Sequence, residues 1–352
     1  MTSERTIHVR RAGLSTTVQD FGRFHTRHLG VSIGGAMDRV SHELANRLAG
    51  NSPADATLEM TLNGDELHWT FDSIIAITGA EMDPLAELAT STSDTNAKIM
   101  ATAVPCHRPV LIPAGTTIHF RSARRGCRCY LAVAGGLEVP EILGSRSTLT
   151  RAALGGHQGR RLQAGDVLSV RRGNTDQPHI SESADHTALR FPEWFVRPVD
   201  LPPSSDYVEC PIRILPGSEF EQLTHDSQER FLGSSFQISS ASDRMGYRLN
   251  GNRLALNDQP ERPSEGTTVG TIQLPPDGHP IMLMADSAPS GGYPRIAHII
   301  SADLPLVAQL RPGQRIRFHL VMLSEASTLL REQRQIIDRA MAMMSWRQRE
   351  RC

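Results

Sequence analysis

Short apolar or alternating segments recur along the whole chain, and Gly, Pro and Asp bound them. Segments of this kind predict β-strands. The expected strands cover 7–10, 74–78, 110–112, 118–121, 129–134 and 167–170, and later 213–215, 272–274, 281–284, 296–300 and 316–320. Many short strands with few helices are typical of barrels and sandwiches, so we expect a mainly β protein.

Two segments have the spacing of a helix instead. Residues 39–49 follow Asp38, a favoured N-cap, and precede Gly50, a favoured residue just beyond a helix. The second helix is expected from Ser324 to about Trp346. Its apolar residues at helical spacing are Leu329, Leu330, Ile336, Ile337, Met341 and Met344. We expect this C-terminal helix to pack on its own domain, and the alternative is a helix that binds a partner.

A polar region divides the chain into two parts. Residues 173–207 lack periodicity and are rich in Pro, Ser and Asp, which predicts a linker. Within it, the aromatic run 191–195 is expected to dock on a folded domain. The predicted domains are therefore 1–172 and 208–322, and a C-terminal helix and tail occupy 323–352.

Two smaller features bear on this division. Residues 113–120 and 311–318 share a Gly turn that leads into an alternating strand. This repeat favours related halves, although turn-then-strand units are also common in any β protein. The polar run 87–98 predicts a mobile loop.

Charge excludes some classes of function. The chain has 37 basic and 38 acidic residues, so its net charge is -1. Proteins that bind nucleic acid or anionic membranes carry a basic surplus, so we expect neither partner. The sequence has no signal-peptide pattern and no apolar stretch long enough to span a bilayer, so we expect a cytoplasmic protein.

The five cysteines predict neither disulfides nor a metal site. Their number is odd and their spacing irregular. Cys127 and Cys129 resemble half of a metal site, but no matching pair exists elsewhere in the sequence. We expect no metal, and an alternating strand that carries both thiols on one face.

Three loops have the composition of catalytic or anion-binding motifs. Residues 30–34 fit the G-x-S-x-G pattern, but the helix does not begin directly after Ser32, so a nucleophilic serine is not expected. The glycines of 155–161 lack the lysine of a phosphate loop. Arg146 is flanked by hydroxyl side chains and could bind a carboxylate or phosphate group through two hydrogen bonds. The alternative is that Arg146 holds a neighbouring loop in place.

The second half contains polar residues at expected strand ends. Glycines beside Asp, Arg and Tyr at such positions build a polar pocket at a barrel mouth. They occur in 242–249, at Asp286 and in 290–294. For Arg244 two interpretations remain, contact with substrate or a structural pair with Asp243.

A set of short stretches along the chain is, taken together, specific to one family. They are residues 16–20, 35–38, 44–48, 58–61, 77–80, 124–128, 134–136, 144–148, 242–249, 291–294 and 309–313. In these motifs the chain resembles the carboxyltransferase-type family of allophanate hydrolase subunit 2, the C subunit of 5-oxoprolinase and the carboxyltransferase domain of urea carboxylase. The resemblance implies two cyclophilin-like β-barrel domains with a few short helices.

Within this family the stretches 291–297 and 300–303 favour the 5-oxoprolinase branch. The resemblance then implies one subunit of an ATP-dependent hydrolase that opens 5-oxoproline to glutamate, with a B subunit and an A subunit as partners. It implies ATP use by the complex and no cofactor held by this chain. One alternative is a carboxyltransferase subunit of a biotin-dependent urea or amide carboxylase, or of an allophanate hydrolase. A second alternative is a non-catalytic regulatory protein that binds a partner.

Opening a lactam requires an oxyanion site, a contact for the substrate carboxylate and a group for proton transfer. The residue types of the shared motifs suggest these roles. The candidates for binding the oxyanion are backbone N–H groups near Gly34, Gly35, Gly79, Gly291 and Gly292. Tyr293 is a further candidate for substrate binding. Arg146 or Arg244 is the candidate for the carboxylate. Asp20, Asp38, Glu59 and Asp286 are the candidates for proton transfer.

Overall fold

The structure is a computed structural model of the 352-residue chain. It describes residues 4–88, 101–172, 180, 188–196, 201–203, 205, 208–258 and 263–349, with backbone only from 344 onward. Most of the expected polar loop 87–98 and of the linker 173–207 lies outside these residues. The chain divides into two compact units, the first made of 1–22, 38–201 and 338–352, the second of 23–37 and 202–337.

The first unit contains two antiparallel sheets that share one core. The first sheet comprises β1 (Thr6–Arg11), β4 (Glu66–Trp69), β6 (Leu85–Glu87), β7 (Ala101–Ala103), β9 (Thr117–His119) and β11 (Val167–Ser169), in the order β11-β1-β4-β9-β6-β7. The second comprises β2 (Thr16–Gln19), β3 (Thr57–Thr61), β5 (Ser73–Glu81), β8 (Pro109–Ile112) and β10 (Arg125–Val133), in the order β2-β3-β10-β5-β8. Ile7 and Trp69 from the first sheet join Leu58 and Leu131 from the second in one buried cluster.

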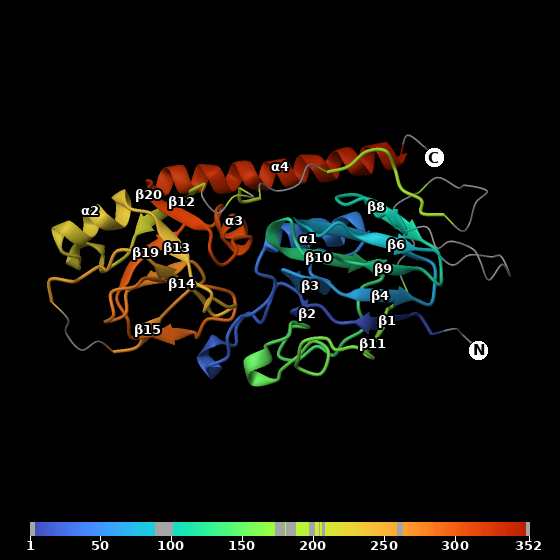
Figure 1. The fold of residues 1–352 in the computed structure, drawn as a ribbon, viewed down its shortest axis with the longest axis horizontal. Coiled ribbons are helices and arrows are strands. Elements are labelled where there is room, and N and C mark those ends of the chain that lie inside the picture. The colour runs from blue at the N-terminus through green and yellow to red at the C-terminus, as the bar shows by residue number, and fades with distance from the viewer. Residues whose placement is uncertain are drawn as a thin grey trace. The chain divides into compact units, whose positions relative to one another are not determined.

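The second unit is built on a closed barrel. Its strands are β12 (Cys210–Pro216), β13 (Phe236–Ile238), β14 (Gly246–Asn250), β16 (Thr271–Gln273), β17 (Ile281–Leu283), β19 (Arg295–Ile299) and β20 (Arg315–Leu320), and Figure 1 shows them in yellow to red. β12 and β20 run parallel. The strands β15 (Glu265–Gly266) and β18 (Ser290–Gly291) form a separate two-stranded sheet.

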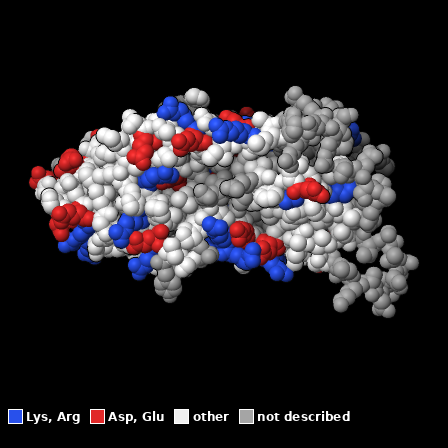
Figure 2. Space-filling view, turned by 90° about the horizontal axis from the view of Figure 1, so that it is seen from above, with Lys and Arg blue, Asp and Glu red and all other residues white. Residues whose placement is uncertain are grey.

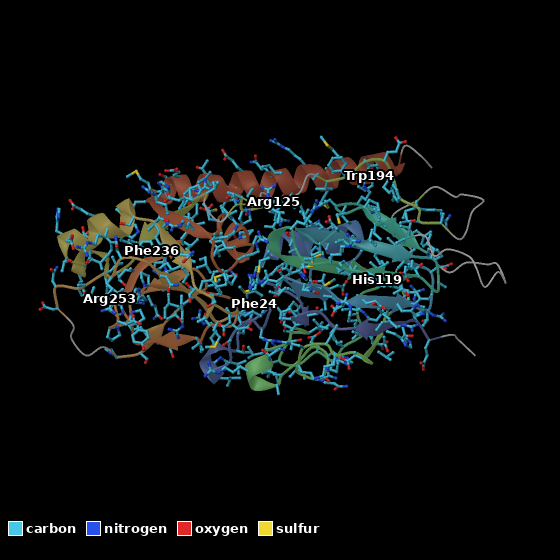
Figure 3. All side chains as sticks on the ribbon, in the orientation of Figure 1. Phe24, His119, Arg125, Trp194, Phe236 and Arg253 are labelled. Atoms are coloured by element: carbon cyan, nitrogen blue, oxygen red, sulfur yellow. The ribbon has the colours of Figure 1, made fainter. Side chains whose placement is uncertain are left out.

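Aromatic rings fill part of the barrel core. Phe236, labelled in Figure 3, lies 6.1 Å from Phe231 and 5.8 Å from Phe318 between ring centroids. All three side chains are fully buried. Closure of the barrel pairs its strand edges, so the fold holds the loops at its ends on a rigid frame.

The described residues form four α-helices. α1 (Arg39–Leu48) begins where expected, because the Asp38 carboxylate accepts a hydrogen bond from the backbone N–H of Ser41 at 2.9 Å. α4 (Leu323–Arg349) is the expected C-terminal helix, and its Ala326 packs with Ile300 and Ala302 of the second unit. The sequence analysis missed α2 (His225–Gly233) and α3 (Leu304–Ala308). Three single-turn 3-10 helices, η1 (Arg27–Leu29), η2 (Thr150–Ala152) and η3 (Phe220–Gln222), complete the helical elements of these residues.

The expected fold class is confirmed: the protein is mainly β, with a closed barrel and a C-terminal helix. Closure occurs in the second unit, whereas the described strands of the first unit form two sheets. The aromatic run 191–195 does dock, since the Arg108 guanidinium lies 5.7 Å from the Phe191 ring and 5.3 Å from the Phe195 ring. The expected domain boundaries stay a prediction, and residues 23–37 lie with the second unit.

Candidate functional site

The glycine-rich loop 23–37 packs on the second unit through its backbone. Gly34 has a φ of 66°, which favours glycine, and its N–H donates to the carbonyl of Ala285 at 3.0 Å. Ser32 donates its hydroxyl to the carbonyl of Asp286 at 3.1 Å. Because its N–H is engaged, Gly34 shapes this loop and does not donate to an oxyanion in this conformation.

Arg244 and Asp286 form a bidentate ion pair beside the same loop. The Nε and Nη2 atoms of Arg244 each lie 2.9 Å from a carboxylate oxygen of Asp286. Nη2 also donates to the carbonyl of Gly35 at 2.6 Å. The Asp286 side chain is 7% exposed and that of Arg244 is 15% exposed, so little water screens the pair. The structure therefore brings Gly34, Gly35, Arg244 and Asp286 together.

Asp243 has a different role from the expected pair with Arg244. Its carboxylate accepts a hydrogen bond from the backbone N–H of Met245 at 2.8 Å and so closes the turn before β14. The carbonyl of Arg244 accepts from the N–H of Asp286 at 2.8 Å. Backbone and side chain thus fix Arg244 against Asp286.

A small pocket adjoins this cluster in the second unit. It has about 230 Å³ of empty space, partly open to solvent, and its lining includes Ala285 and Ser287, the two neighbours of Asp286 in the chain. Arg27 lies in its wall and donates to the carbonyls of Thr267 and Pro289. Much of this space is open to solvent, and the enclosed part, about 10 Å³, has room for about one water molecule.

Gly291, Gly292 and Tyr293 line a second pocket, whose empty space of about 200 Å³ includes open solvent. Arg295 holds one side of it, and its backbone N–H donates to the Glu219 carboxylate at 2.7 Å. Burial raises the pKa of Glu219, but the hydrogen bonds from Arg295 outweigh it and leave the pKa below its usual range. The two pockets share no lining residue.

In the first unit, Asp20 organises the loop that carries Arg146. Its carboxylate accepts hydrogen bonds from the N–H of Gly22 at 2.7 Å, the hydroxyl of Ser145 at 2.7 Å and the N–H of Arg146 at 2.6 Å. The hydroxyl of Ser147 is a fourth donor. Burial raises the pKa of Asp20, but these hydrogen bonds prevail and lower it. A carboxylate so held suits positioning better than proton transfer.

Hydrogen bonds link Asp38 and Glu59 through Tyr130, which the sequence analysis did not identify as a candidate. Tyr130 lies between them, and its hydroxyl accepts from the N–H of Asp38 at 2.8 Å and donates to the Glu59 carboxylate at 2.7 Å. Arg128 lies 3.7 Å from the other oxygen of Glu59. All four residues are buried, and burial raises the pKa of Tyr130 well above its usual value. This network fixes the start of α1.

His42, on the first turns of α1, borders this network. Its Nδ1 lies 2.9 Å from the hydroxyl of Thr57, and its ring packs edge-on against Phe21. The side chain is fully buried. Burial lowers the pKa of His42 to about 4, against the opposing effect of the Asp20 and Glu59 charges. The ring is therefore neutral near pH 7.

The two remaining candidates lie apart in the first unit. Gly79 is a buried residue within β5, opposite Cys129 of β10. Arg146 is partly exposed, and its guanidinium lies 3.2 Å from the Glu141 carboxylate. The structure thus distributes the candidates over several clusters, and their catalytic roles stay predictions. Tyr130 lies in β10, where every residue after Arg125 is buried, and nothing in the sequence of this apolar strand could have identified it.

Three further observations concern metal binding, membrane crossing and surface charge. Within the described ranges no group of three or more His, Cys, Asp or Glu side chains is arranged to hold a metal ion. In the same ranges, no helix has the length and apolar character needed to cross a membrane. On the face shown in Figure 2, basic and acidic side chains are interspersed.

Comparison with known proteins identifies relatives across nearly the whole chain. The sequence is 36% identical to the C subunit of 5-oxoprolinase from Escherichia coli, in an alignment that covers 96% of this chain and 97% of the relative. It is also 36% identical to the Haemophilus influenzae protein of the same name, over 92% of this chain and 93% of that one. With urea amidolyase of Lachancea kluyveri it shares 32% identity over 87% of this chain and 16% of the relative.

Solved structures of fungal enzymes have the same fold. Urea amidolyase of K. lactis matches 97% of this chain with a TM-score of 0.80 and 28% identity, over 20% of its own length. The urea carboxylase of Kluyveromyces lactis matches the same share with a TM-score of 0.81 and 27% identity, over 30% of its length. The family model for the carboxyltransferase domain, subdomain A and B, matches residues 29–320. The chain therefore belongs to the carboxyltransferase domain family, in which it is similar to the C subunit of 5-oxoprolinase.

Proposed function

We propose that this chain is the C subunit of an ATP-dependent 5-oxoprolinase, which hydrolyses 5-oxoproline to glutamate together with an A and a B subunit. The observation that carries the proposal is the match in length with the C subunit of the Escherichia coli 5-oxoprolinase, since 96% of this chain aligns with 97% of that protein. The urea amidolyase match covers only 16% of a much longer relative.

The cluster around Arg244 supports this chemistry. Attack on an amide carbonyl places negative charge on its oxygen, and the substrate 5-oxoproline carries a carboxylate as well. A guanidinium fixed by a carboxylate and a carbonyl is a preorganised positive group, which needs no rearrangement when such charge appears. In this proposal Arg244 holds an anionic group of the substrate, and Asp286 fixes Arg244.

Reconstitution tests the proposal. The chain is combined with purified A and B subunits, 5-oxoproline and ATP, and glutamate and ADP are measured with each subunit omitted in turn. We expect both products only when all three proteins are present. Glutamate formation that is unchanged when this chain is omitted would overturn the proposal, as would its absence from the complete mixture.

A second candidate follows from the solved structures. The fold match to fungal urea carboxylase, with a TM-score of 0.81, favours a carboxyltransferase subunit that acts on urea or another small amide with a biotinylated partner. Affinity purification of the chain from its native cells, followed by detection of biotin with streptavidin, distinguishes the two. A biotinylated protein in the complex supports this second candidate, and partners without biotin support the first.

A further inference from the structure

Two short strands, β6 and β7, form one edge of the first sheet, and we call them the edge pair. They follow β9 in the order of the sheet, and among the described residues β7 pairs with β6 alone. β6 pairs with β9, where Leu85 lies opposite His119 and Glu87 lies opposite Thr117. All three residues of β7 are exposed. Because the ladder between β6 and β9 is short, side-chain contacts across these two strands affect whether the edge pair stays closed.

His119, labelled in Figure 3, lies between two carboxylates on the strands that flank β9. Its Nδ1 atom is 3.2 Å from Oε2 of Glu66 on β4, and its Nε2 atom is 3.2 Å from Oε1 of Glu87 on β6. A neutral imidazole has one N–H and one bare nitrogen, so it can donate to only one of two carboxylates and turns a lone pair towards the other. The protonated ring donates from both nitrogens. These two contacts are therefore those of an imidazolium.

The protonated ring completes a row of alternating charge across four strands. Arg11 on β1 lies 3.9 Å from Glu66, so the row from β1 to β6 reads positive, negative, imidazolium, negative. β7 adds no titratable side chain, since its residues are Ala, Thr and Ala. When His119 loses its proton, Glu66 keeps Arg11 nearby, whereas Glu87 loses the cation that it faces. Because opposite charges on neighbouring strands stabilise a sheet, the attachment of β6 weakens most.

The neighbouring histidines of this sheet have different surroundings. His68 on β4 has its Nδ1 atom 3.0 Å from the hydroxyl of Thr117, and its ring centroid lies 6.2 Å from that of His8 on β1. Burial lowers the pKa of His68, and the nearby Arg10 and His8 lower it further. The charged form of His68 is thus disfavoured, whereas His119 faces two carboxylates. Protonation of His119, and not of His68, therefore joins neighbouring strands.

We propose that His119 is a pH-sensitive latch, whose protonated ring ties the edge pair to the rest of the first sheet. Histidine changes its charge between about pH 5 and 8. The stabilisation is present while the ring is protonated, and it is lost as pH rises through this range. The edge pair is then closed in mild acid and opens more often in mild base. This inference goes beyond the proposed function and does not depend on it, because it concerns one sheet of the first unit.

Hydrogen exchange of the full chain, followed by mass spectrometry at pH 6 and pH 8 and corrected for the intrinsic pH dependence of amide exchange, tests the latch. We expect peptides that contain β6 and β7 to open at least about threefold more often at pH 8, because the contacts of a charged ring are lost. His119→Arg keeps a positive charge and should hold the edge pair closed at both pH values. His119→Gln should leave it open at both. His8→Gln is the matched control, since His8 lies on β1 of the same sheet, and it should keep the pH dependence of the parent.

Several results would overturn the inference. One is equal opening of the edge pair at both pH values in the parent protein. Another is a His119→Gln variant that retains the pH dependence, or a His8→Gln variant that loses it. If His119→Arg opens as often as His119→Gln, charge is not what ties the strands. Loss of protection throughout the first unit in His119→Gln would mean that the ring supports the whole unit and not the edge pair. None of these results bears on the reconstituted enzyme, so the proposed function is tested separately.

Discussion

The Arg244 guanidinium and the Asp286 carboxylate face each other through two N–O contacts of 2.9 Å, and the loop 23–37 closes over them with the carbonyl of Gly35. The geometry uses the planar fork of arginine, which a lysine does not possess. This pair therefore joins two segments that lie far apart in sequence and fixes the direction of one positive charge.

Replacement of Arg244 by lysine tests the importance of this geometry. We expect Arg244→Lys to lower the rate of the reconstituted enzyme at least about tenfold, which corresponds to about 1.4 kcal/mol in transition-state stabilisation. Steady-state kinetics with 5-oxoproline measures the effect. Arg248→Lys is the control, because Arg248 is an exposed arginine on the adjacent strand β14. Full activity of Arg244→Lys would contradict a role for the guanidinium.

Asp20→Asn should destabilise the first unit near pH 7. An amide has one acceptor oxygen where the carboxylate has two, so buried donors lose their partner, at a cost of about 1–3 kcal/mol. Because the folded pKa of Asp20 is lowered, its contribution is present above the unfolded value of about 3.9 and is lost as pH falls through the folded pKa. Urea unfolding at several pH values should show the difference between variant and parent shrinking in acid. Asp258→Asn, at an exposed carboxylate, should behave as the parent.

The buried His42 leads us to expect a second, separate pH dependence of the unfolding free energy. Its folded pKa is about 4 and its ordinary value 6.5, so the unfolded chain binds the proton first as pH falls. Stability is therefore complete above pH 6.5 and declines towards pH 4, by about 3 kcal/mol at most. His42→Gln should flatten the unfolding free energy over this range relative to the parent protein. A variant whose pH profile is parallel to that of the parent would argue against a buried neutral ring.

Tyr130→Phe removes the hydroxyl that joins Asp38 to Glu59. The buried Glu59 carboxylate then loses a donor and the N–H of Asp38 loses an acceptor, which should cost about 2–4 kcal/mol in unfolding free energy. Chemical denaturation measures this cost. Tyr293→Phe changes an exposed tyrosine and should have little effect. If both variants unfold at the same denaturant concentration as the parent, the network does not stabilise α1.

Features set by neighbouring residues were predictable from the sequence. The Asp38 cap and the apolar spacing determine α1 locally, and alternation with turn residues locates the central strands. α2 was missed because, of its nine residues, only Ser227 and Phe231 are buried, which leaves no apolar periodicity. Barrel closure depends on pairing of distant strands such as β12 with β20, which no local pattern encodes.

The sequence identified candidate residues of the site, but it did not show which of them contact one another. Arg244 and Asp286 were both candidates, yet their pairing depends on a separation of 42 residues, and the nearer Asp243 was the simpler partner to expect. Asp20 was identified as an acid, but the Ser145 and Arg146 donors lie 125 and 126 residues away. Contacts of this length follow from the tertiary fold, so the sequence could not show that the Asp20 carboxylate accepts these hydrogen bonds.

The assignment of residues 23–37 to the second unit affects how the protein can be divided. A gene fragment that begins after residue 201 encodes the whole barrel yet omits the strand-free segment whose Gly35 carbonyl binds Arg244. Such a fragment should expose the apolar surface that Met37 covers in the barrel core, and should aggregate unless a peptide of residues 23–37 is supplied in trans. We therefore expect that the two halves of the gene do not fold as independent modules, and that recombination between relatives succeeds only where this segment and its barrel come from the same parent.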